Sequence, residues 1–351
     1  MGVGAFGRNH LRVYRDLALS AQSSQPPVRV TAIVEPDTDQ VASLNWPADA
    51  PYPFPPVYES LDALLSARAR GGVRVDAASV CVPTSGHADA ASALMSSGID
   101  VLVEKPIAVT VAEAEQMVAT ATQHDRILQV GQLERFNPAV MAAEKMRNHP
   151  MFFEAHRLSI FTPRALDVDV VLDLMIHDLD VVLHLAQSPV SEVHAVGLPI
   201  VSPKIDIANV RIEFESGCVA NFTASRVSTE RVRKLRFFQP HQYVSLDYAR
   251  KDLLVIDVTS DTMLSQASIE ELTRESSSNP LLPPGLRMHK PDVEDAEPLR
   301  LEIESFIESV RTRKRPKVSG EDGSRALALA IQIHESISAH AHRAGLQRFT
   351  V

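Results

Sequence analysis

The sequence has few of the features that mark secreted, membrane-spanning or nucleic-acid-coating proteins. Its two cysteines, Cys81 and Cys218, lie in apolar or strand-like contexts without the spacing of metal ligands. No apolar run approaches the ~18 residues of a membrane span, and the amino terminus lacks the cationic start and apolar run of a signal peptide. The net charge of −9 argues against a protein that coats nucleic acid. We therefore expect a cytoplasmic protein that binds no metal, no nucleic acid and no membrane.

The composition is that of an ordinary globular protein. Of the 351 residues, 45% are hydrophobic and 23% are charged, which excludes a disordered or fibrous chain. A length of this size predicts roughly two domains.

The first third of the chain alternates between strand-like and helical patterns. Strands separated by helices of this length form βαβ units, so we predict an α/β fold with a doubly wound parallel sheet over residues 1–130. The expected strands cover residues 28–34, 77–82, 99–103 and 127–130. The expected helices cover residues 8–19, 59–69, 86–97 and 110–124.

Residues 131–351 show a different pattern. A strong helix over 168–186 precedes a series of strands with short turns, which predicts an α+β domain with an open, mainly antiparallel sheet. The expected strands cover residues 190–198, 207–215, 218–227, 231–239, 242–249 and 252–258. Residues 275–297 are rich in Pro and Ser and predict an exposed loop, and helices are expected over 299–312 and 321–344.

The first candidate site is a glycine loop that would bind a dinucleotide. Gly2, Gly4 and Gly7, with Ala5 and Phe6 between them, have the GxGxxG spacing of a turn that brings a pyrophosphate to a helix amino terminus. Glu35, at the end of the second expected strand, can accept both ribose hydroxyls and would repel a 2′-phosphate, which favours NAD over NADP. A chance glycine-rich turn and a solvated acid at a strand end are the alternatives.

Two further positions carry side chains suited to proton transfer. Lys105 follows a strand of the parallel sheet, where ligands bind, and partial desolvation beside a cationic nicotinamide would lower its pKa toward acid–base use. Asp173 and His177 are four residues apart on one helix, so the carboxylate can orient the imidazole. A solvated lysine and a capped surface helix are the alternative interpretations.

These motifs resemble those of the Gfo/Idh/MocA oxidoreductases over essentially the whole chain. The resemblance rests on the glycine loop, Val82-Pro83-Thr84 with His87, Glu104-Lys105-Pro106 and Asp173 to Asp178. It implies that Lys105, His177 and Asp173 are catalytic. It also implies that Pro83, Thr84, His87, Glu104 and Lys105 contact the cofactor together with the glycine loop and Glu35.

A narrower resemblance is to the branch of that family that oxidises UDP-N-acetylglucosamine at its 3-hydroxyl. The segments around Gly131 to Val140, His156 to Ser159 and Thr162 to Arg164 carry it. A diphosphate requires cationic side chains, so Arg135, Arg157 and Arg164 are expected to bind substrate. Asn137 would contact a sugar hydroxyl or amide, and His177 would also touch the substrate. Each arginine alone could instead form a surface salt bridge, and Asn137 could merely precede Pro138 in a turn.

The sequence thus predicts an NAD-dependent dehydrogenase of a sugar nucleotide. Dehydrogenases of another sugar, an inositol or a sugar-nucleotide uronic acid remain alternatives, as does a non-catalytic NAD-binding regulator. The retention of both Lys105 and His177 argues against a regulator. The resemblance also implies a homodimer or homotetramer formed through the open sheet.

One feature departs from the doubly wound pattern. The glycine loop begins at residue 2, whereas such a loop normally follows the first strand of the sheet, which is central in the strand order. A missing central strand would leave neighbouring backbone groups buried and unpaired. We therefore expect that the working protein carries a few more residues with an apolar β pattern before Met1.

Overall fold

The computed structural model describes residues 1–19, 28–47, 52–162, 168–258 and 286–346, and it divides into two compact units. Unit 1 comprises Met1–Phe136 and Glu297–Ala328, and unit 2 comprises Asn137–Ala296 and Leu329–Val351. The sequence pattern predicts one boundary near residue 130. The difference lies in residues 297–328, which return to unit 1.

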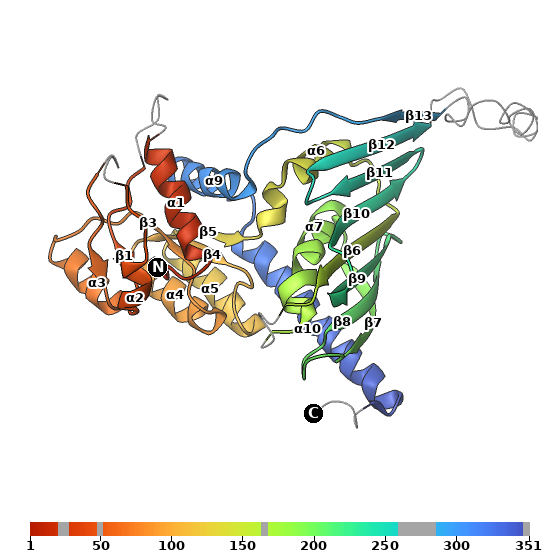
Figure 1. Cartoon of the computed structure of the whole chain (residues 1–351), viewed down its shortest axis with the longest axis horizontal. Helices are drawn as coiled ribbons and strands as arrows, with labels where there is room; N and C mark the ends of the chain where they lie inside the picture. Colours follow the sequence, from red (N-terminus) through yellow and green to blue (C-terminus); the bar gives the residue numbers. More distant parts are fainter. Residues whose placement is uncertain (20–27, 48–51, 163–167, 259–285, 347–351) are drawn as a thin grey trace, which may run out of the picture. The chain divides into compact units, whose positions relative to one another are not determined.

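Unit 1 is built on short parallel strands with helices on both faces (Figure 1). Strand β1 pairs with β2, and β3-β4-β5 form a separate three-stranded parallel sheet. The strands of unit 1 are β1 (Ile33–Val34), β2 (Val57–Tyr58), β3 (Ala77–Val80), β4 (Asp100–Glu104) and β5 (Leu128–Gly131). Its helices are α1 (Gly7–Leu19), α2 (Thr38–Ala42), α3 (Leu61–Ala69), α4 (His87–Ser96), α5 (Val111–Gln123) and α9 (Pro298–Thr312).

Helix α9 returns to unit 1 because its apolar side completes the core there. Leu299, Ile303 and Phe306 are buried in one cluster with Val13 of α1 and Leu102 of β4. Residues far apart in the sequence thus share one core. The order of the elements along the chain does not reveal this shared core.

Unit 2 is an eight-stranded sheet with the strand order β13-β12-β11-β10-β6-β9-β8-β7. The β6–β9 pair is parallel and the other pairs are antiparallel, so the predicted fold class is confirmed. Its strands are β6 (Phe152–Ile160), β7 (Val190–Leu198), β8 (Ile207–Phe214), β9 (Val219–Ser228), β10 (Val232–Gln239), β11 (Gln242–Asp247), β12 (Asp252–Val258) and β13 (Leu286–His289).

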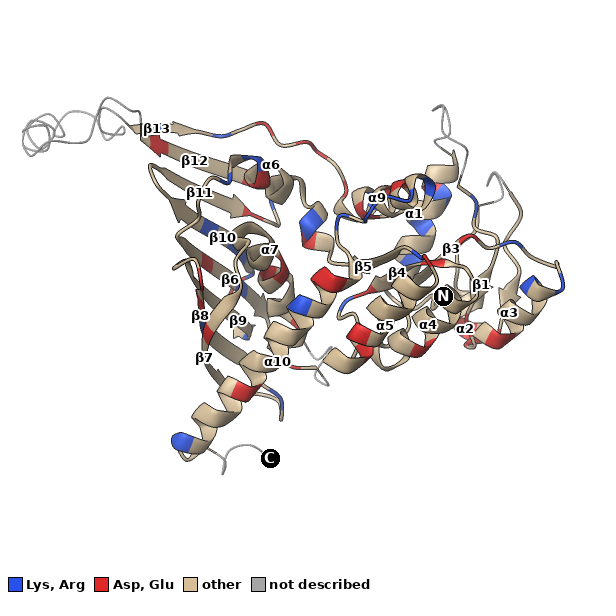
Figure 2. Ribbon diagram, turned by 180° about the vertical axis from the view of Figure 1, so that it is seen from behind, with Lys and Arg blue, Asp and Glu red and all other residues tan. Residues whose placement is uncertain are grey.

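Helices cover one face of this sheet, and alternate strand residues on the other face stay more exposed (Figure 1). The covering helices are α6 (Pro138–Met146), α7 (Ile176–Ala186) and the second half of α10 (Gly320–Arg343). Figure 2 shows acidic and basic residues intermixed on the strands, as in the Arg236–Glu154 pair between β10 and β6. Within the described residues, no helix is both long and apolar enough to cross a lipid bilayer.

Three expectations about the elements differ from the structure. The strand expected over 28–34 is reduced to Ile33–Val34, where β2 supplies a partner. Strand β6 was missed, because its residues were interpreted only as part of a ligand-binding motif. The loop expected over 275–297 lies partly outside the described residues and contains β13.

Candidate active site

The glycine loop folds as the spacing predicts. The three glycines differ in what an added side chain would contact. Gly2 has a φ of +75°, and a Cβ there would lie 2.7 Å from the carbonyl oxygen of Cys81. A Cβ on Gly7 would lie 2.0 Å from the Gly2 carbonyl oxygen, so α1 can start against the loop only without a side chain. Among the described residues, a Cβ on Gly4 would meet only Gln40 Oε1, at 3.6 Å. The fold does not require glycine at position 4, so the space there fits the close backbone approach of a cofactor pyrophosphate.

Glu35 lies directly after β1 and holds the glycine loop. Its carboxylate accepts hydrogen bonds from the Val3 N–H at 2.8 Å and from the Asp37 N–H at 3.1 Å. A carboxylate oxygen can accept more than one hydrogen bond, so the predicted contact with the ribose remains open to it. The structure adds a role in loop positioning that the motif did not reveal.

Lys105 lies in the turn at the carboxyl end of β4, and its neighbour Glu104 is held from two sides. His10 Nε2, on α1, lies 2.8 Å from Glu104 Oε1, and the Lys105 N–H donates to Glu104 Oε2 at 3.3 Å. A Cβ on Gly131 of β5 would come within 2.8 Å of the Glu104 carboxylate. Only a glycine at position 131 leaves room for this arrangement.

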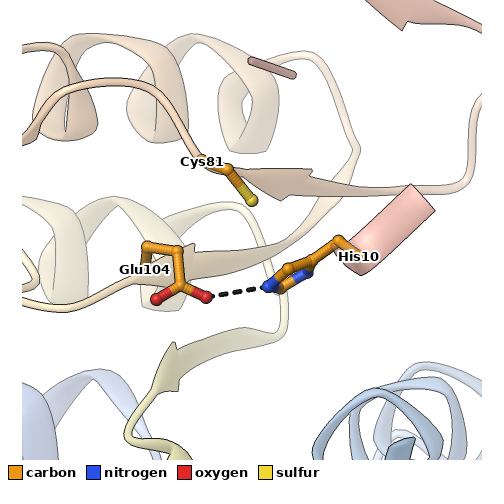
Figure 3. A group of neighbouring side chains, drawn as sticks. All are labelled: His10, Cys81 and Glu104. Carbon is orange, nitrogen blue, oxygen red and sulfur yellow. Dashed lines mark hydrogen bonds and ion pairs between the residues drawn. The ribbon is translucent and has the colours of Figure 1, made fainter. Parts of the chain in front are cut away.

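Figure 3 shows that His10, Cys81 and Glu104 converge from α1 and from the ends of β3 and β4. Their donor atoms lie within 4.8 Å of one another, and imidazole, thiolate and carboxylate are ligands that Zn²⁺ accepts. Burial lowers the pKa of His10, but hydrogen bonds to Cys81 and Glu104 outweigh it and raise the pKa to about 10. The imidazole is therefore protonated at neutral pH, so the cluster favours an ion pair over a metal.

A buried acid from α9 lies in the same electrostatic environment. Burial raises the pKa of Glu302 well above its ordinary value, and the Glu104 charge raises it further, while His10 opposes. Neither carboxylate oxygen of Glu302 has a hydrogen-bond partner among the described residues. The raised pKa favours the protonated form of Glu302 beside the His10–Glu104 pair.

His87 connects two turns of the expected cofactor site. It is 1% exposed, and its ring nitrogens each lie 2.9 Å from a backbone carbonyl oxygen, those of Pro106 and Val82. The predicted contact of His87 with the cofactor stays a prediction. Pro83 directly precedes the short helix Thr84–Gly86, and Thr84 is its first residue.

In unit 2, Asp173 and His177 lie where a π-helical turn, Val171–Met175, leads into α7. Single π turns inside helices are frequently found at functional sites. Asp169 caps the start of this helix by accepting hydrogen bonds from the Val171 and Leu172 N–H groups. The structure thus fixes the backbone that carries both predicted catalytic side chains.

Three residues expected to bind substrate are buried and already bonded to the protein. Arg157 is 2% exposed, and its guanidinium pairs with Asp178 at 2.7 and 3.0 Å and lies over the Tyr248 ring. Asn137 caps α6 through the Ala139 N–H and donates to the Tyr248 carbonyl oxygen.

Arg135 is likewise buried, and it donates to the Lys317 carbonyl oxygen at 3.3 Å. The structure thus gives Arg135, Asn137 and Arg157 structural contacts, and their contacts with substrate stay predictions. Arg164 lies outside the described residues.

Sequence reasoning also missed His10 and Gly131, the two residues that confine Glu104. His10 follows Gly7 by one helical turn, so its position on α1 facing the sheet could have been deduced from helix geometry. Its partner Glu104 lies 94 positions away in the sequence, and no local signal connects them.

Comparison with protein families matches the two parts of the chain to two adjoining models. Residues 1–132 match an oxidoreductase family model with an NAD-binding Rossmann fold, and residues 143–239 match a GFO/IDH/MocA C-terminal domain. The chain belongs to the Gfo/Idh/MocA oxidoreductase family. It is thus an NAD-binding oxidoreductase that acts on CH–OH groups, and the space at Gly4 fits that cofactor.

Relatives extend the match to nearly the full length. The chain is 32% identical over 344 residues to UDP-N-acetylglucosamine 3-dehydrogenase of Acidithiobacillus ferrooxidans, covering 98% of this chain and 97% of the relative. A solved structure of that enzyme superposes with a TM-score of 0.78 at 30% identity and covers 96% of each chain. Myo-inositol 2-dehydrogenase of Thermotoga maritima is 25% identical, covering 75% of this chain and 78% of the relative.

A more distant structure supports the fold. An oxidoreductase from Agrobacterium radiobacter in complex with NAD⁺, L-tartaric acid and magnesium superposes with a TM-score of 0.75 at 16% identity, covering 96% of this chain and 94% of the other.

Proposed function

We propose that this protein oxidises a ring hydroxyl of a sugar nucleotide to a ketone with NAD⁺, and that the substrate is UDP-N-acetylglucosamine at its 3-hydroxyl. The similarity to a UDP-N-acetylglucosamine 3-dehydrogenase over 98% of the chain carries this proposal. The inositol dehydrogenases among the relatives are less similar and cover less of the chain.

The proposed chemistry needs a group that removes the hydroxyl proton while the carbinol hydrogen leaves as hydride. Bound NAD⁺ supplies the hydride acceptor. Lys105 Nζ and the His177 imidazole are the proposed proton acceptors, and Asp173 orients His177. General acid–base catalysis of this kind contributes typically ~10²–10⁴-fold to the rate.

The environment of the Lys105 turn supports a positioned rather than a mobile lysine. Glu104 is fixed by the buried His10 and by the space that Gly131 leaves, and its carboxylate holds the Lys105 backbone N–H. His87 bonds the carbonyl oxygen of Pro106, the next residue. Catalysis gains from such fixed geometry because little freedom is lost when substrate binds.

Arg164 is the arginine that we propose binds the diphosphate of the substrate. Because Arg135 and Arg157 are buried in structural contacts, Arg164 is the remaining arginine of the predicted set for the diphosphate. A homodimer or homotetramer formed through the open sheet stays a prediction. Partly exposed apolar side chains on its strands, among them Val196 and Phe238, are consistent with it.

The test is a substrate panel with purified protein and NAD⁺, read by absorbance of the reduced cofactor. We expect UDP-N-acetylglucosamine to react, and UDP-glucose, free N-acetylglucosamine, myo-inositol and a UDP-uronic acid to react at least ~100-fold more slowly. Lys105→Met should lower kcat by ~10²–10⁴-fold while the Kd for NAD⁺ stays within about threefold. Turnover of myo-inositol alone would contradict the proposed substrate, and full activity of Lys105→Met would remove this lysine from the mechanism.

A further inference from the structure

The turn that leads into α7 decides how Asp173 lies relative to His177. The Ile176 N–H bonds to the Val171 carbonyl oxygen, five residues back, whereas an α-helix bonds four residues back. This π turn rotates Asp173 relative to His177, compared with a continuous α-helix. The groups that hold the π turn therefore set the relative direction of the two side chains.

Asp169 holds this turn through both its side chain and its backbone. Its carboxylate accepts hydrogen bonds from the Val171 N–H at 2.8 Å and the Leu172 N–H at 3.2 Å. Its backbone carbonyl oxygen accepts a hydrogen bond from the Asp173 N–H at 3.0 Å. Asp169 is thus bonded directly to the residue that is proposed to orient His177.

A histidine of α10 lies against the Asp169 carboxylate. His334 Nε2 is buried and lies 3.2 Å from Asp169 Oδ1, the oxygen that accepts both N–H groups. The preceding residue, Ile333, is buried in the core of unit 2 and fixes this part of α10. Burial raises the pKa of Asp169, but His334 and the two N–H groups lower it below its ordinary value. The carboxylate is therefore ionised at neutral pH and can pair with a protonated imidazole.

The backbone just before the turn is held by groups other than His334. The Val170 N–H donates to the Ile205 carbonyl oxygen at 3.0 Å, and Arg226 of β9 donates to the Val168 carbonyl oxygen. A change at His334 should therefore alter the turn locally and leave the helix folded.

We propose that His334 is a positioning residue of the dehydrogenase, an inference that rests on the proposed roles of Asp173 and His177. His334 holds the Asp169 carboxylate against the N–H groups of the π turn, and the turn fixes Asp173 in the direction that it needs to orient His177. His334 acts through Asp169 and needs no contact with substrate. Such placement matters because a displacement of ~1 Å can lower a rate ~100-fold.

The test compares the native protein with His334→Leu, His334→Gln and His184→Leu. His184 is the matched control, because it lies farther along α7, with its Nε2 2.7 Å from Glu144 Oε1. We expect His334→Leu to lower kcat for the sugar nucleotide ~10–100-fold, while KM and the Kd for NAD⁺ stay within about threefold. The amide of His334→Gln can still donate to Asp169, so its kcat should stay within about threefold. The kcat of His184→Leu should stay within about twofold.

Amide hydrogen exchange gives a readout that needs no substrate. The N–H groups of Asp173 and Ile176 make bonds of this turn, so exchange there should become ~10-fold faster in His334→Leu. It should not change in His334→Gln or His184→Leu. If His334→Leu does not fold, His334→Asn replaces it, because its shorter amide cannot reach Asp169.

A second pair of substitutions tests whether His334 acts through Asp169. In protein that already carries Asp169→Asn, His334→Leu should change kcat by less than about twofold, because no carboxylate remains for the histidine to hold. Full additivity of the two substitutions would show that His334 acts elsewhere and would overturn the proposal.

Two other outcomes would also overturn it. The first is unchanged exchange at Asp173 and Ile176 in His334→Leu. The second is an equal loss of kcat in His334→Leu and His184→Leu, which would indicate general destabilisation of unit 2. If the native protein does not oxidise the sugar nucleotide, the proposed function fails, while amide exchange still decides whether His334 holds the turn.

Discussion

The buried polar side chains of unit 2 show how a residue suited to ligand binding can serve the fold instead. Arg157 has the planar guanidinium that a diphosphate requires, yet the same geometry fits the Asp178 carboxylate, next to His177. The pair joins β6 to α7, the helix that carries the proposed catalytic histidine. The ion pair therefore positions this helix, and the contact of Arg157 with substrate stays a prediction.

The first prediction concerns this ion pair. Arg157→Met leaves Asp178 buried without its partner and should lower the free energy of unfolding by ~3–5 kcal/mol. Replacing both residues by apolar ones should recover most of that loss. Arg236→Met, in the more exposed pair with Glu154, is the control and should cost less than ~1 kcal/mol.

Urea unfolding of the native protein and these three variants measures the differences. A mild effect of Arg157→Met on stability, combined with a large rise in KM for the sugar nucleotide, would restore Arg157 as a substrate ligand.

The second prediction concerns His10, whose folded pKa of about 10 lies above the ordinary value of 6.5. A raised pKa stabilises the fold fully below about pH 6.5, and this stabilisation is lost as the pH rises toward 10. The groups that face His10 are Cys81, Glu104 and Glu302.

Between pH 7 and 9.5, the unfolding free energy of the native protein should therefore fall more steeply than that of His10→Gln, by up to ~1.4 kcal/mol per pH unit. Chemical unfolding across this range gives both slopes. Parallel curves for the two proteins would show that His10 does not hold a proton in the folded state.

At the scale of elements, apolar periodicity predicted most helices and strands, because each buries one side against a core. The strands β7 and β12 match the expected ranges, and α1, α5 and α9 begin within a residue or two of them. The sequence did not predict strand β6, because the segment around Arg157 was interpreted only as part of the substrate-binding motif. A strand over 28–34 needs partner strands to hydrogen-bond with, and the apolar periodicity of the segment does not show where such partners lie.

The third prediction separates two functions within the glycine loop. Gly4→Ala meets no atom of the described residues closer than 3.6 Å and should change the Tm by less than ~2 °C. Its methyl group should weaken NAD⁺ binding at least ~10-fold. Gly7→Ala would place its Cβ 2.0 Å from the Gly2 carbonyl oxygen and should lower the Tm sharply. Calorimetry and fluorescence titration of both variants measure the two effects. If Gly4→Ala binds NAD⁺ normally, the pyrophosphate does not lie against this glycine.

At the scale of the whole molecule, the motifs predicted the family, the cofactor and the fold class, which the comparisons confirm. They could not predict which arginines are free for substrate, because that depends on tertiary partners such as Asp178 and the Lys317 carbonyl. They also could not predict the return of residues 297–328 to unit 1, which follows from the shared core of α9, α1 and β4.

The central claim is that hydride leaves C3 of the sugar ring of UDP-N-acetylglucosamine. Its most direct test is turnover of substrate that carries deuterium at C3, with NMR of the reduced cofactor. We predict that deuterium appears at nicotinamide C4 and that kcat/KM falls about two- to threefold, as expected when C–H cleavage limits the rate. Reduced cofactor without deuterium, or no turnover of this sugar nucleotide, would contradict the account.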